Sequence, residues 1–418
     1  MSFLTQNPEN LGRSITKPFC PALRKALMEI AYSLISMKVL VVGCGNIGSV
    51  AAKDLAKSMK SLEIVVADNN EARAKAVAED IGTDNVSSIR LDVADQHTLL
   101  DTLRGYTLVM GFLPGNLGYR LAETCVKAGK DMVDVSYMAE NPLLLDNKAA
   151  KAGVTVVPDC GLAPGISNLL VGHAAASLNE VRTVRIMVGG LPEKPLPPLG
   201  YVITWSAESL IDEYTRKAGI IRKGRKTEVE ALSELEEIEF PGVGKLEAFY
   251  TDGLRTLMYT IDKPDEMWEK TLRYPGHAER IKMLRALGFF DESPVSVNGT
   301  RISPRKLTAT LLTQKLQRPE NKDIVALRVE VSGIEKCKKT KYRYHLLDFY
   351  DEKHNVTAMA RTTAYPASIA ARLLLGKAIK DKGLVPVEKI GMHNELFRTF
   401  IDELEKRNVK VTEEKSVG

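Results

Sequence analysis

The chain of 418 residues has few cysteines and none in a close pair. Its five cysteines include no Cys-x-x-Cys motif, and an odd count at wide spacing indicates free thiols in a reducing compartment. No group of histidines and cysteines has the spacing of a metal site. No apolar run approaches the roughly 20 residues of a membrane span. We therefore expect a cytoplasmic protein without a metal centre or a transmembrane helix.

An excess of one sign of charge is also missing. The formal net charge is +5, from 58 Lys and Arg against 53 Asp and Glu, and no basic stripe is interleaved with aromatic residues. The basic runs at 222–226 and 336–341 are typical of solvated turns between strands. The sequence therefore gives no reason to expect a nucleic acid partner. The length and the 44% hydrophobic content favour a globular protein of two or more domains.

Residues 1–36 differ from the chain that follows. They contain Pro8, Pro18 and Pro21 and an amphipathic piece at 22–35, without the compact apolar core and cleavage site of a secretory signal. We predict a poorly ordered N-terminal extension, with the first domain beginning at Met37.

A glycine-rich turn follows the first convincing strand. In "MKVLVVGCGNIGSVAAKDLAKS" a buried apolar strand leads into Gly43-x-Gly45-x-x-Gly48 and then into a helical pattern. In this context the motif indicates dinucleotide binding. Gly43 permits the tight turn, Gly45 lets the backbone approach a pyrophosphate, and Gly48 lets the helix pack closely on the strand. The phosphates would meet the free N–H groups of the helix N-terminus.

The second strand, "LEIVVAD", ends at Asp68, which is 25 residues after Gly43. A carboxylate at this position accepts hydrogen bonds from the adenosine ribose and repels the extra phosphate of NADP. We therefore expect NAD as the cofactor, with NADP less favoured, although Arg73 could soften that preference.

Strands then alternate with helices as far as residue 159. Further strands are expected within 86–93, 106–111, 130–138 and 154–159. This alternation predicts an α/β domain with a Rossmann doubly wound parallel sheet, whose ligands lie beyond the carboxyl ends of the strands. The predicted cofactor contacts are Gly43, Gly45, Asn46, Ile47, Gly48, Asp68, Asp92, Val93, Phe112, Leu113, Pro114, Asp134, Val135, Ser136, Leu162 and Pro164.

The pattern changes in the second half of the chain. Alternating strands, a hairpin turning at Gly224 and two long strands joined by a Lys-rich turn predict a mixed, largely antiparallel sheet. We expect a Rossmann domain over 37–160 and an α+β domain for substrate and dimer contacts over 161–355. Helices over 356–418 are expected to pack back on the Rossmann domain.

Several stretches carry a family resemblance. Taken in order, "VVGCGNIGSVAAKDLA", "VDVSYM", "VPDCGLAPGISNLLVG", "LEAFYTDGLRTL", "KTLRYPGHAE" and "VTAMARTTAYP" resemble the saccharopine dehydrogenase-like family, and within it most closely the lysine 6-dehydrogenases. The resemblance runs from about residue 37 to 387.

The resemblance implies an oxidoreductase that uses a nicotinamide cofactor and forms a homodimer. Its substrate would be the ε-amine of L-lysine, oxidised to 2-aminoadipate 6-semialdehyde, which cyclises to piperideine-6-carboxylate. The alternative within the family is a dehydrogenase or reductase of saccharopine or carboxynorspermidine. An alternative of another class is a non-catalytic regulator that binds the nicotinamide cofactor.

Oxidising an amino acid's amine by hydride transfer requires a clamp for the carboxylate. Arg255 and Arg273 are the candidates for a bidentate clamp, because both lie at strand–turn junctions. An ordinary ion pair with a nearby acid is the alternative role for each. Tyr201 and Trp205, which follow a Pro-rich loop, are predicted to wall the substrate pocket, and Ser136 is a further predicted substrate contact.

The same reaction requires a base to remove the ammonium proton. His277 is the first candidate because the ordinary pKa of histidine is about 6.5, and a helix-capping or structural role is its alternative. Asp134 and Asp252 are the other two candidates. Asp134 lies at a strand end where the nicotinamide is expected.

Overall fold

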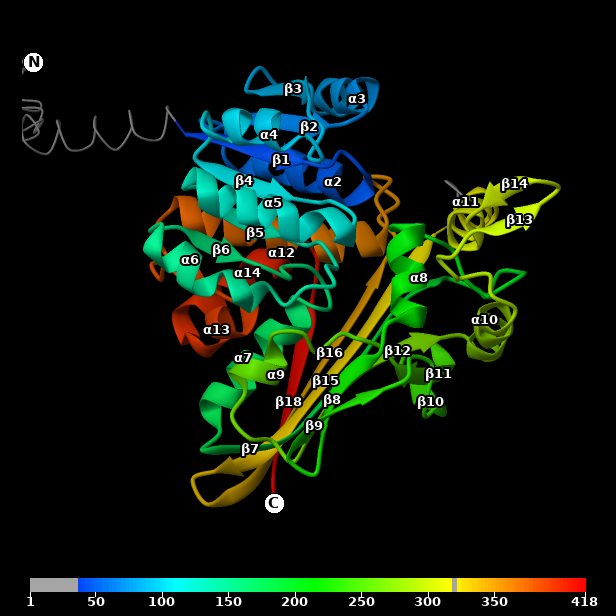
Figure 1. Ribbon diagram of the computed structural model, residues 1–418. Coiled ribbons are helices and arrows are strands. Elements are labelled where there is room, and N and C mark those ends of the chain that lie inside the picture. The colour runs from blue at the N-terminus through cyan, green and yellow to red at the C-terminus, as the bar shows by residue number, and fades with distance from the viewer. Residues whose placement is uncertain (1–36, 318–321) are drawn as a thin grey trace, which may run out of the picture.

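The first domain is built around a parallel sheet (Figure 1). The structure is a computed structural model that describes residues 37–317 and 322–418. The predicted extension at 1–36 lies outside the described residues. Seven strands pair in the order β17-β6-β5-β4-β1-β2-β3. Their bounds are β1 Lys38–Val42, β2 Glu63–Asp68, β3 Val86–Arg90, β4 Leu108–Gly111, β5 Asp131–Asp134, β6 Thr155–Val157 and β17 Gly383–Leu384.

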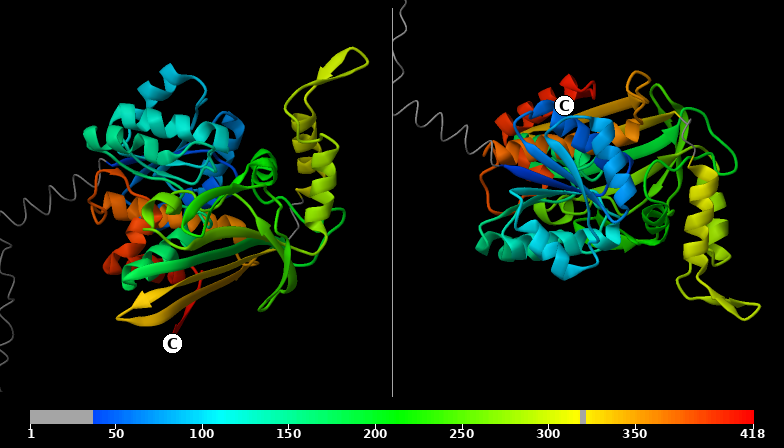
Figure 2. Two further views of the ribbon diagram at one scale, coloured as in Figure 1. Left: turned by 60° about the horizontal axis from the view of Figure 1, so that its bottom comes forward. Right: turned by 90° about the horizontal axis from the view of Figure 1, so that it is seen from above.

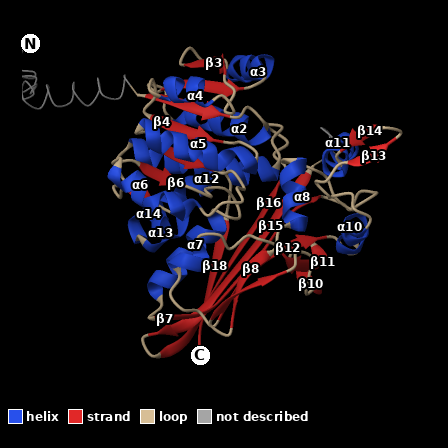
Figure 3. Cartoon of the chain, viewed as in Figure 1, coloured by secondary structure: helices blue, strands red, loops and turns tan. Residues whose placement is uncertain are grey.

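Helices cover both faces of this sheet, which explains why its central strands are nearly continuous apolar runs. Figure 3 shows the alternation of helix and strand that the sequence predicts. The fold class is therefore confirmed. The helices that follow the strands are α2 Asn46–Ser58, α3 Glu71–Ile81, α4 Gln96–Leu103, α5 Gly115–Ala128, a 3₁₀ turn Pro142–Leu145, and α6 Asp146–Lys151.

The second sheet is mixed and largely antiparallel. Its main path is β10-β11-β12-β7-β15-β16-β18, with β8 and β9 attached beside β12, and the pair β12–β7 is parallel. The predicted hairpin at Gly224 is the β8–β9 turn. The strands are β7 Glu180–Pro192, β8 Ala218–Arg222, β9 Arg225–Val229, β10 Glu236–Phe240, β11 Gly244–Tyr250, β12 Glu266–Arg273, β15 Asp323–Glu335, β16 Lys338–Phe349 and β18 Val411–Val417.

Four helices and a small hairpin accompany the second sheet. Helix α8 lies over one face of it, and the hairpin β13–β14 stands away from the rest of the chain, as both views of Figure 2 show. These elements are α8 Ala207–Thr215, α9 Leu257–Thr260, α10 His277–Ala286, β13 Val295–Val297, β14 Thr300–Ile302 and α11 Pro304–Leu316.

The remaining helices are α7 Ile166–Ser177, α12 Ala358–Leu375, α13 Val387–Met392 and α14 Asn394–Lys406. Of these, α12 packs on α2 and on strands of both sheets, whereas α7, α13 and α14 pack against one another beside it. Asp54 on α2 accepts hydrogen bonds from Ser368 on α12 and from Arg407, whose Nε lies 2.8 Å away. The chain after residue 356 also supplies β17 to the first sheet and β18 to the second.

Two kinds of feature are absent from the described ranges. None of their helices is long and apolar enough to cross a membrane. Within the same ranges, no three His, Cys, Asp or Glu side chains come together in a way that could hold a metal ion.

Candidate functional site

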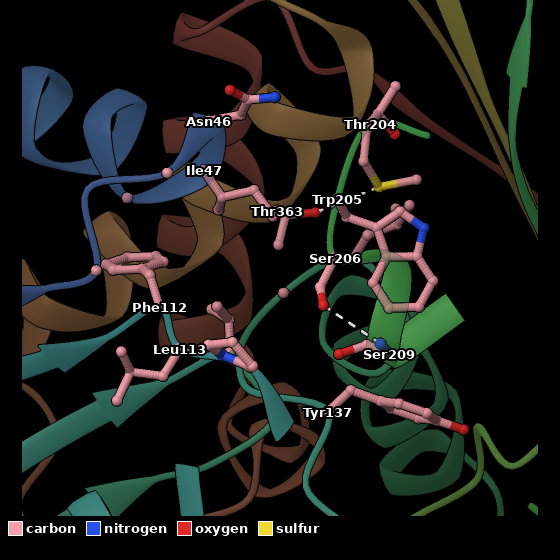
Figure 4. Close-up of a pocket in the computed structure, with 18 of the residues that line it drawn as sticks. Asn46, Ile47, Phe112, Leu113, Tyr137, Thr204, Trp205, Ser206, Ser209 and Thr363 are labelled. Atoms are coloured by element: carbon pink, nitrogen blue, oxygen red, sulfur yellow. Dashed lines mark hydrogen bonds between the residues drawn. The ribbon is translucent and has the colours of Figure 1, made fainter. Parts of the chain in front are cut away.

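A cavity of about 870 Å³ opens where the carboxyl ends of the parallel strands face the second sheet. Figure 4 shows its two sides. Asn46 and Ile47 at the start of α2 and Phe112 and Leu113 after β4 belong to one side. The other side, around the start of α8, contains Thr204, Trp205, Ser206 and Ser209. We call these sides the cofactor wall and the substrate wall. The position agrees with the rule for ligands of open α/β sheets.

The cofactor wall begins with the glycine-rich turn. Gly43 has a φ of +102°, and a Cβ on Gly48 would lie 1.9 Å from the Gly43 carbonyl oxygen, so both positions require glycine. A Cβ on Gly45, by contrast, would meet no protein atom within 4 Å. Gly45 caps the N-terminus of α2 without a side-chain hydrogen bond. The open backbone and the free N–H groups of this helix end fit a pyrophosphate.

Asp68 lies at the end of β2 on the same wall. Its two carboxylate oxygens accept hydrogen bonds from the backbone N–H groups of Cys44 and Asn70, each at 2.9 Å. Arg73 also lines the cavity, and its Nη1 lies 3.8 Å from Asp68 Oδ2. A dinucleotide in this cavity would therefore meet a fixed carboxylate with a guanidinium beside it.

Most predicted cofactor contacts line the cavity, and two do not. Asp134 and Ser136 do not line it, because the Asp134 carboxylate turns into the protein and accepts hydrogen bonds from the Ser136 N–H at 2.8 Å and its hydroxyl at 2.9 Å. Burial raises the pKa of Asp134 to about 7. In this position Asp134 is not placed to act as a base towards a ligand in the cavity. The contacts that line it are Gly43, Gly45, Asn46, Ile47, Gly48, Asp68, Asp92, Val93, Phe112, Leu113, Pro114, Val135, Leu162 and Pro164.

Arg255 does not line the cavity either, which removes the geometric basis for its predicted role as a clamp. Its buried guanidinium pairs with buried Asp159, with Nε 3.4 Å from Oδ2, and donates to the Glu140 carbonyl. Both partners have positive φ values, 53° for Arg255 and 54° for Asp159. A strained and charge-paired contact of this kind ties the end of β6 to the loop after β11.

Asp252, a candidate base, does not line the cavity either. Its carboxylate lies 3.6 Å from Arg216 Nη1, and its carbonyl accepts a hydrogen bond from the Tyr137 hydroxyl at 2.9 Å. The Arg216 guanidinium lies 4.5 Å from the centre of the Tyr137 ring. These contacts hold the loop after β5 against the second domain. In this structure Asp252 therefore has a structural role.

His277 is the largest departure from the sequence-based predictions. The imidazole is buried behind the substrate wall and does not line the cavity. We assign the Nδ1–H as donor to the Leu199 carbonyl at 2.9 Å, so that Nε2 accepts from the Tyr214 hydroxyl at 2.8 Å. Burial, with Arg273 nearby, lowers the pKa of His277 to about 3. A neutral histidine with both nitrogens bonded is a structural residue and not a base for the substrate.

Three other predicted residues do come together on the substrate wall. Arg273, Tyr201 and Trp205 all line the cavity. The Arg273 guanidinium carbon lies 4.6 Å from the centre of the Tyr201 ring, and the Trp205 indole N–H donates to the Tyr201 hydroxyl at 3.1 Å. The indole of Trp205 and its neighbours Thr204 and Ser206 are visible in Figure 4.

Two carboxyl groups on this wall, Glu213 and Glu269, were not predicted from the sequence. Glu269 and Arg273 project from the same face of β12, because alternate residues of a strand share a face. Glu213 projects from α8 and binds Arg273 Nη2 through both its oxygens, at 3.0 and 3.2 Å. Glu269 is 4% exposed, and its burial, with Glu213 nearby, raises its pKa well above the usual range. The alternation of Glu269, Thr271 and Arg273 along β12 was the sequence pattern that could have identified this polar face.

Known proteins resemble the chain over both domains. Residues 39–157 match the family model "Saccharopine dehydrogenase NADP binding domain", and residues 161–409 match "Saccharopine dehydrogenase C-terminal domain". The chain is similar to the saccharopine dehydrogenase [NADP(+), L-glutamate-forming] of Saccharomyces cerevisiae, with 24% identity covering 83% of this chain and 93% of the yeast protein. It is also similar to the carboxyaminopropylagmatine dehydrogenase of Synechocystis, with 23% identity over 84% and 92% of the two chains.

A longer relative and a solved structure complete the comparison. The alpha-aminoadipic semialdehyde synthase of Arabidopsis thaliana is 25% identical over 84% of this chain, which spans 40% of the plant protein's length. The fold matches apo saccharopine dehydrogenase (L-Glu forming) from Saccharomyces cerevisiae with a TM-score of 0.73, at 20% identity over 91% of this chain and 100% of that one. The two family matches together extend from the first strand of the parallel sheet to residue 409, and the chain therefore belongs to the saccharopine dehydrogenase family of nicotinamide-dependent oxidoreductases.

Proposed function

We propose that the protein oxidises the ε-amine of L-lysine with NAD, giving 2-aminoadipate 6-semialdehyde, which cyclises to piperideine-6-carboxylate. The charges of the substrate wall carry this proposal. Among the described residues that line this wall, Arg273 is the only cationic side chain, whereas Glu213 and Glu269 supply two carboxyl groups. Lysine, with one carboxylate and two ammonium groups, complements that set of charges. Saccharopine, with three carboxylates, would need more cationic partners.

The chain's own residues have three tasks in this reaction. Arg273, backed by Glu213, presents a guanidinium for the substrate carboxylate. Tyr201 and Trp205 exclude water from the aliphatic part of the substrate. Carboxyl groups on the wall take the ammonium proton, since only the neutral amine can release hydride from its carbon. A bound nicotinamide ring would supply the hydride acceptor.

NAD is the cofactor favoured by the position of Asp68. A carboxylate that two backbone N–H groups hold in place, with 7% exposure, would accept hydrogen bonds from the ribose and repel a 2′-phosphate. Arg73 is the group that would favour NADP, the cofactor named for the yeast relative. Homodimer formation and a cytoplasmic location stay predictions.

The decisive experiment is a spectrophotometric substrate screen of the full chain at alkaline pH. Reduced nicotinamide should appear with lysine and NAD, more slowly with lysine and NADP, and not with norleucine, which lacks the ε-amine. Activity with saccharopine but not lysine would support the alternative that the named relatives suggest. Tight cofactor binding without turnover of any amine would support a regulator.

A further inference from the structure

A chain of hydrogen bonds joins the two carboxyl groups of the substrate wall. The Thr251 hydroxyl lies 3.1 and 3.3 Å from the two oxygens of Glu269 and 2.8 Å from the Thr271 hydroxyl. The Thr271 hydroxyl in turn lies 2.7 Å from Glu213 Oε1. All four side chains are buried and all four line the cavity. Two carboxyl groups are thus connected by two hydroxyl groups without a break.

The number of available protons restricts how these contacts can be made. Each hydroxyl has one proton and can donate once. When Glu213 is the carboxylate paired with Arg273, Thr271 donates to it, Thr251 donates to Thr271, and Thr251 must accept a proton from Glu269, which is then a carboxylic acid. Reversing every donor puts the proton on Glu213 and the negative charge on Glu269. When both carboxyl groups are ionised, the two hydroxyl protons cannot serve all the contacts from Glu213 to Glu269, and one contact is left without a hydrogen bond.

The surroundings of Glu269 favour the first arrangement and fix the position of its carboxyl group. A Cβ on Gly253 would lie 1.8 Å from Glu269 Oε2, so the missing side chain of Gly253 leaves the space that the carboxyl group occupies. Glu213 has Arg273 as an ionic partner, whereas the hydrogen-bond partner described for the Glu269 carboxyl is the Thr251 hydroxyl. A buried carboxyl group without a cation is more stable as the neutral acid.

We propose that Glu213 and Glu269 share one proton through Thr251 and Thr271, and that Glu269 is the group that accepts the proton of the substrate ammonium. The inference rests on the proposed oxidation of an amine. When the ammonium enters beside Glu269, the acid loses its proton along the hydroxyl chain to water at Glu213, the more exposed end at 9% against 4%. An N–H bond of the ammonium then breaks and an O–H bond forms on Glu269. The neutral amine remains, ready to give hydride to the nicotinamide cofactor, and the pair again holds one proton.

The shared proton can be tested on the free protein by infrared spectroscopy, which detects the carbonyl stretch of a protonated carboxyl group. Glu269→Gln should remove one such band at neutral pH. Glu213→Gln should move the pH at which the band disappears downward, because the neighbouring negative charge is lost. Thr271→Val should also lower that pH, because the Thr251 proton becomes available to the Glu269 carboxylate.

The matched control is Thr124→Val on α5, a buried threonine outside the cavity whose hydroxyl bonds the Arg120 carbonyl. It should leave the band and its midpoint unchanged. A band whose midpoint is the same in wild type, Glu213→Gln and Thr271→Val would overturn the shared proton. Since no substrate is present, that result would leave the proposed oxidation of lysine untouched.

The role of Glu269 towards substrate is tested by proton release and kinetics. In a weakly buffered solution with a pH indicator, the protein should release about one proton per lysine bound and none with norleucine. Glu269→Gln should abolish the release and lower kcat about 100-fold, without recovery at alkaline pH. Unchanged release, or full recovery at high pH, would remove Glu269 from this role. If the protein instead oxidises saccharopine, the same measurement with that amine still decides whether Glu269 is the acceptor.

Discussion

The two walls of the cavity are built in different ways. The central part of the cofactor wall is one short stretch, 43–48, in which glycines set the course of the backbone. The substrate wall is mainly side chains, which α8, the loop after β11 and β12 bring together from distant parts of the chain. The cofactor wall depends on the absence of side chains at its glycines. The substrate wall depends on the contacts between its charged side chains. Substitutions should therefore damage the two walls separately.

The largest effect is expected from Gly48→Ala. Its Cβ would lie 1.9 Å from the Gly43 carbonyl oxygen, so the turn must open and α2 must move away from β1. We expect NAD binding to be lost and the free energy of unfolding to fall by about 1–3 kcal/mol. Calorimetric titration with NAD and thermal melting of the same preparation measure the two effects.

Gly45→Ala and Gly105→Ala are the matched controls for this substitution. A Cβ on Gly45 meets no protein atom within 4 Å, so Gly45→Ala should keep the melting temperature and still weaken NAD binding about tenfold. Gly105→Ala, where the nearest atom would be 3.6 Å away outside the cavity, should change neither. Equal NAD affinity in Gly45→Ala and wild type would show that the pyrophosphate does not approach this turn.

Gly253→Ala should damage the other wall. The new Cβ would occupy the place of the Glu269 carboxylate, and that flexible side chain must move. We expect kcat to fall about tenfold or more, with NAD affinity unchanged, because the loss concerns a proton acceptor and not the cofactor wall. Steady-state kinetics and NAD titration of one variant check both statements. A kcat equal to that of wild type would mean that the position of Glu269 does not matter.

The smallest effect on turnover is expected from His277→Gln, a change behind the substrate wall. In the folded protein the pKa of His277 is lowered to about 3, whereas it is about 6.5 in the unfolded chain. Between these values the unfolded chain binds more protons, so the stability that neutral His277 contributes is present above pH 6.5 and is lost as the pH falls towards 3.

His277→Gln should therefore flatten the acid side of the stability curve while the pH profile of kcat keeps its shape. Denaturant unfolding between about pH 4 and 7 and kinetics over both the acid and the alkaline range measure the two. A pH profile of kcat that loses its acid limb, where the rate falls because a base becomes protonated, would restore His277 as a base.

The cofactor wall could be predicted because its information is local. A strand, three spaced glycines and a helix fix the turn, and the alternation of strands and helices fixes the sheet that carries it. The same locality explains why Arg73 and Asp68 were both recognised from one short segment. Neither the turn nor the pair of Asp68 and Arg73 required knowledge of which side chains are buried.

The substrate wall could be predicted only in part. Arg273, Tyr201 and Trp205 were found through short motifs, but the ion pairs of Arg255 and the burial of His277 depend on packing between distant elements. Glu269 and Thr271 give β12 a polar face, a pattern that usually predicts exposure to solvent, and here that face lines a cavity. The strand β17 was not predicted from the sequence, because a strand of two residues leaves no alternating pattern.

Because β17 pairs with β6, the chain returns to the first sheet after most of the second sheet has been formed, and β18 then completes the second sheet. The parallel sheet is complete only when residues 383–384 reach the strand that ended at residue 157. During synthesis this edge of β6 has no partner strand until β17 has been made, and more than half of the chain lies between the two strands. Exposed strand edges promote aggregation, so covering that edge sets a late and demanding step in the biogenesis of this enzyme.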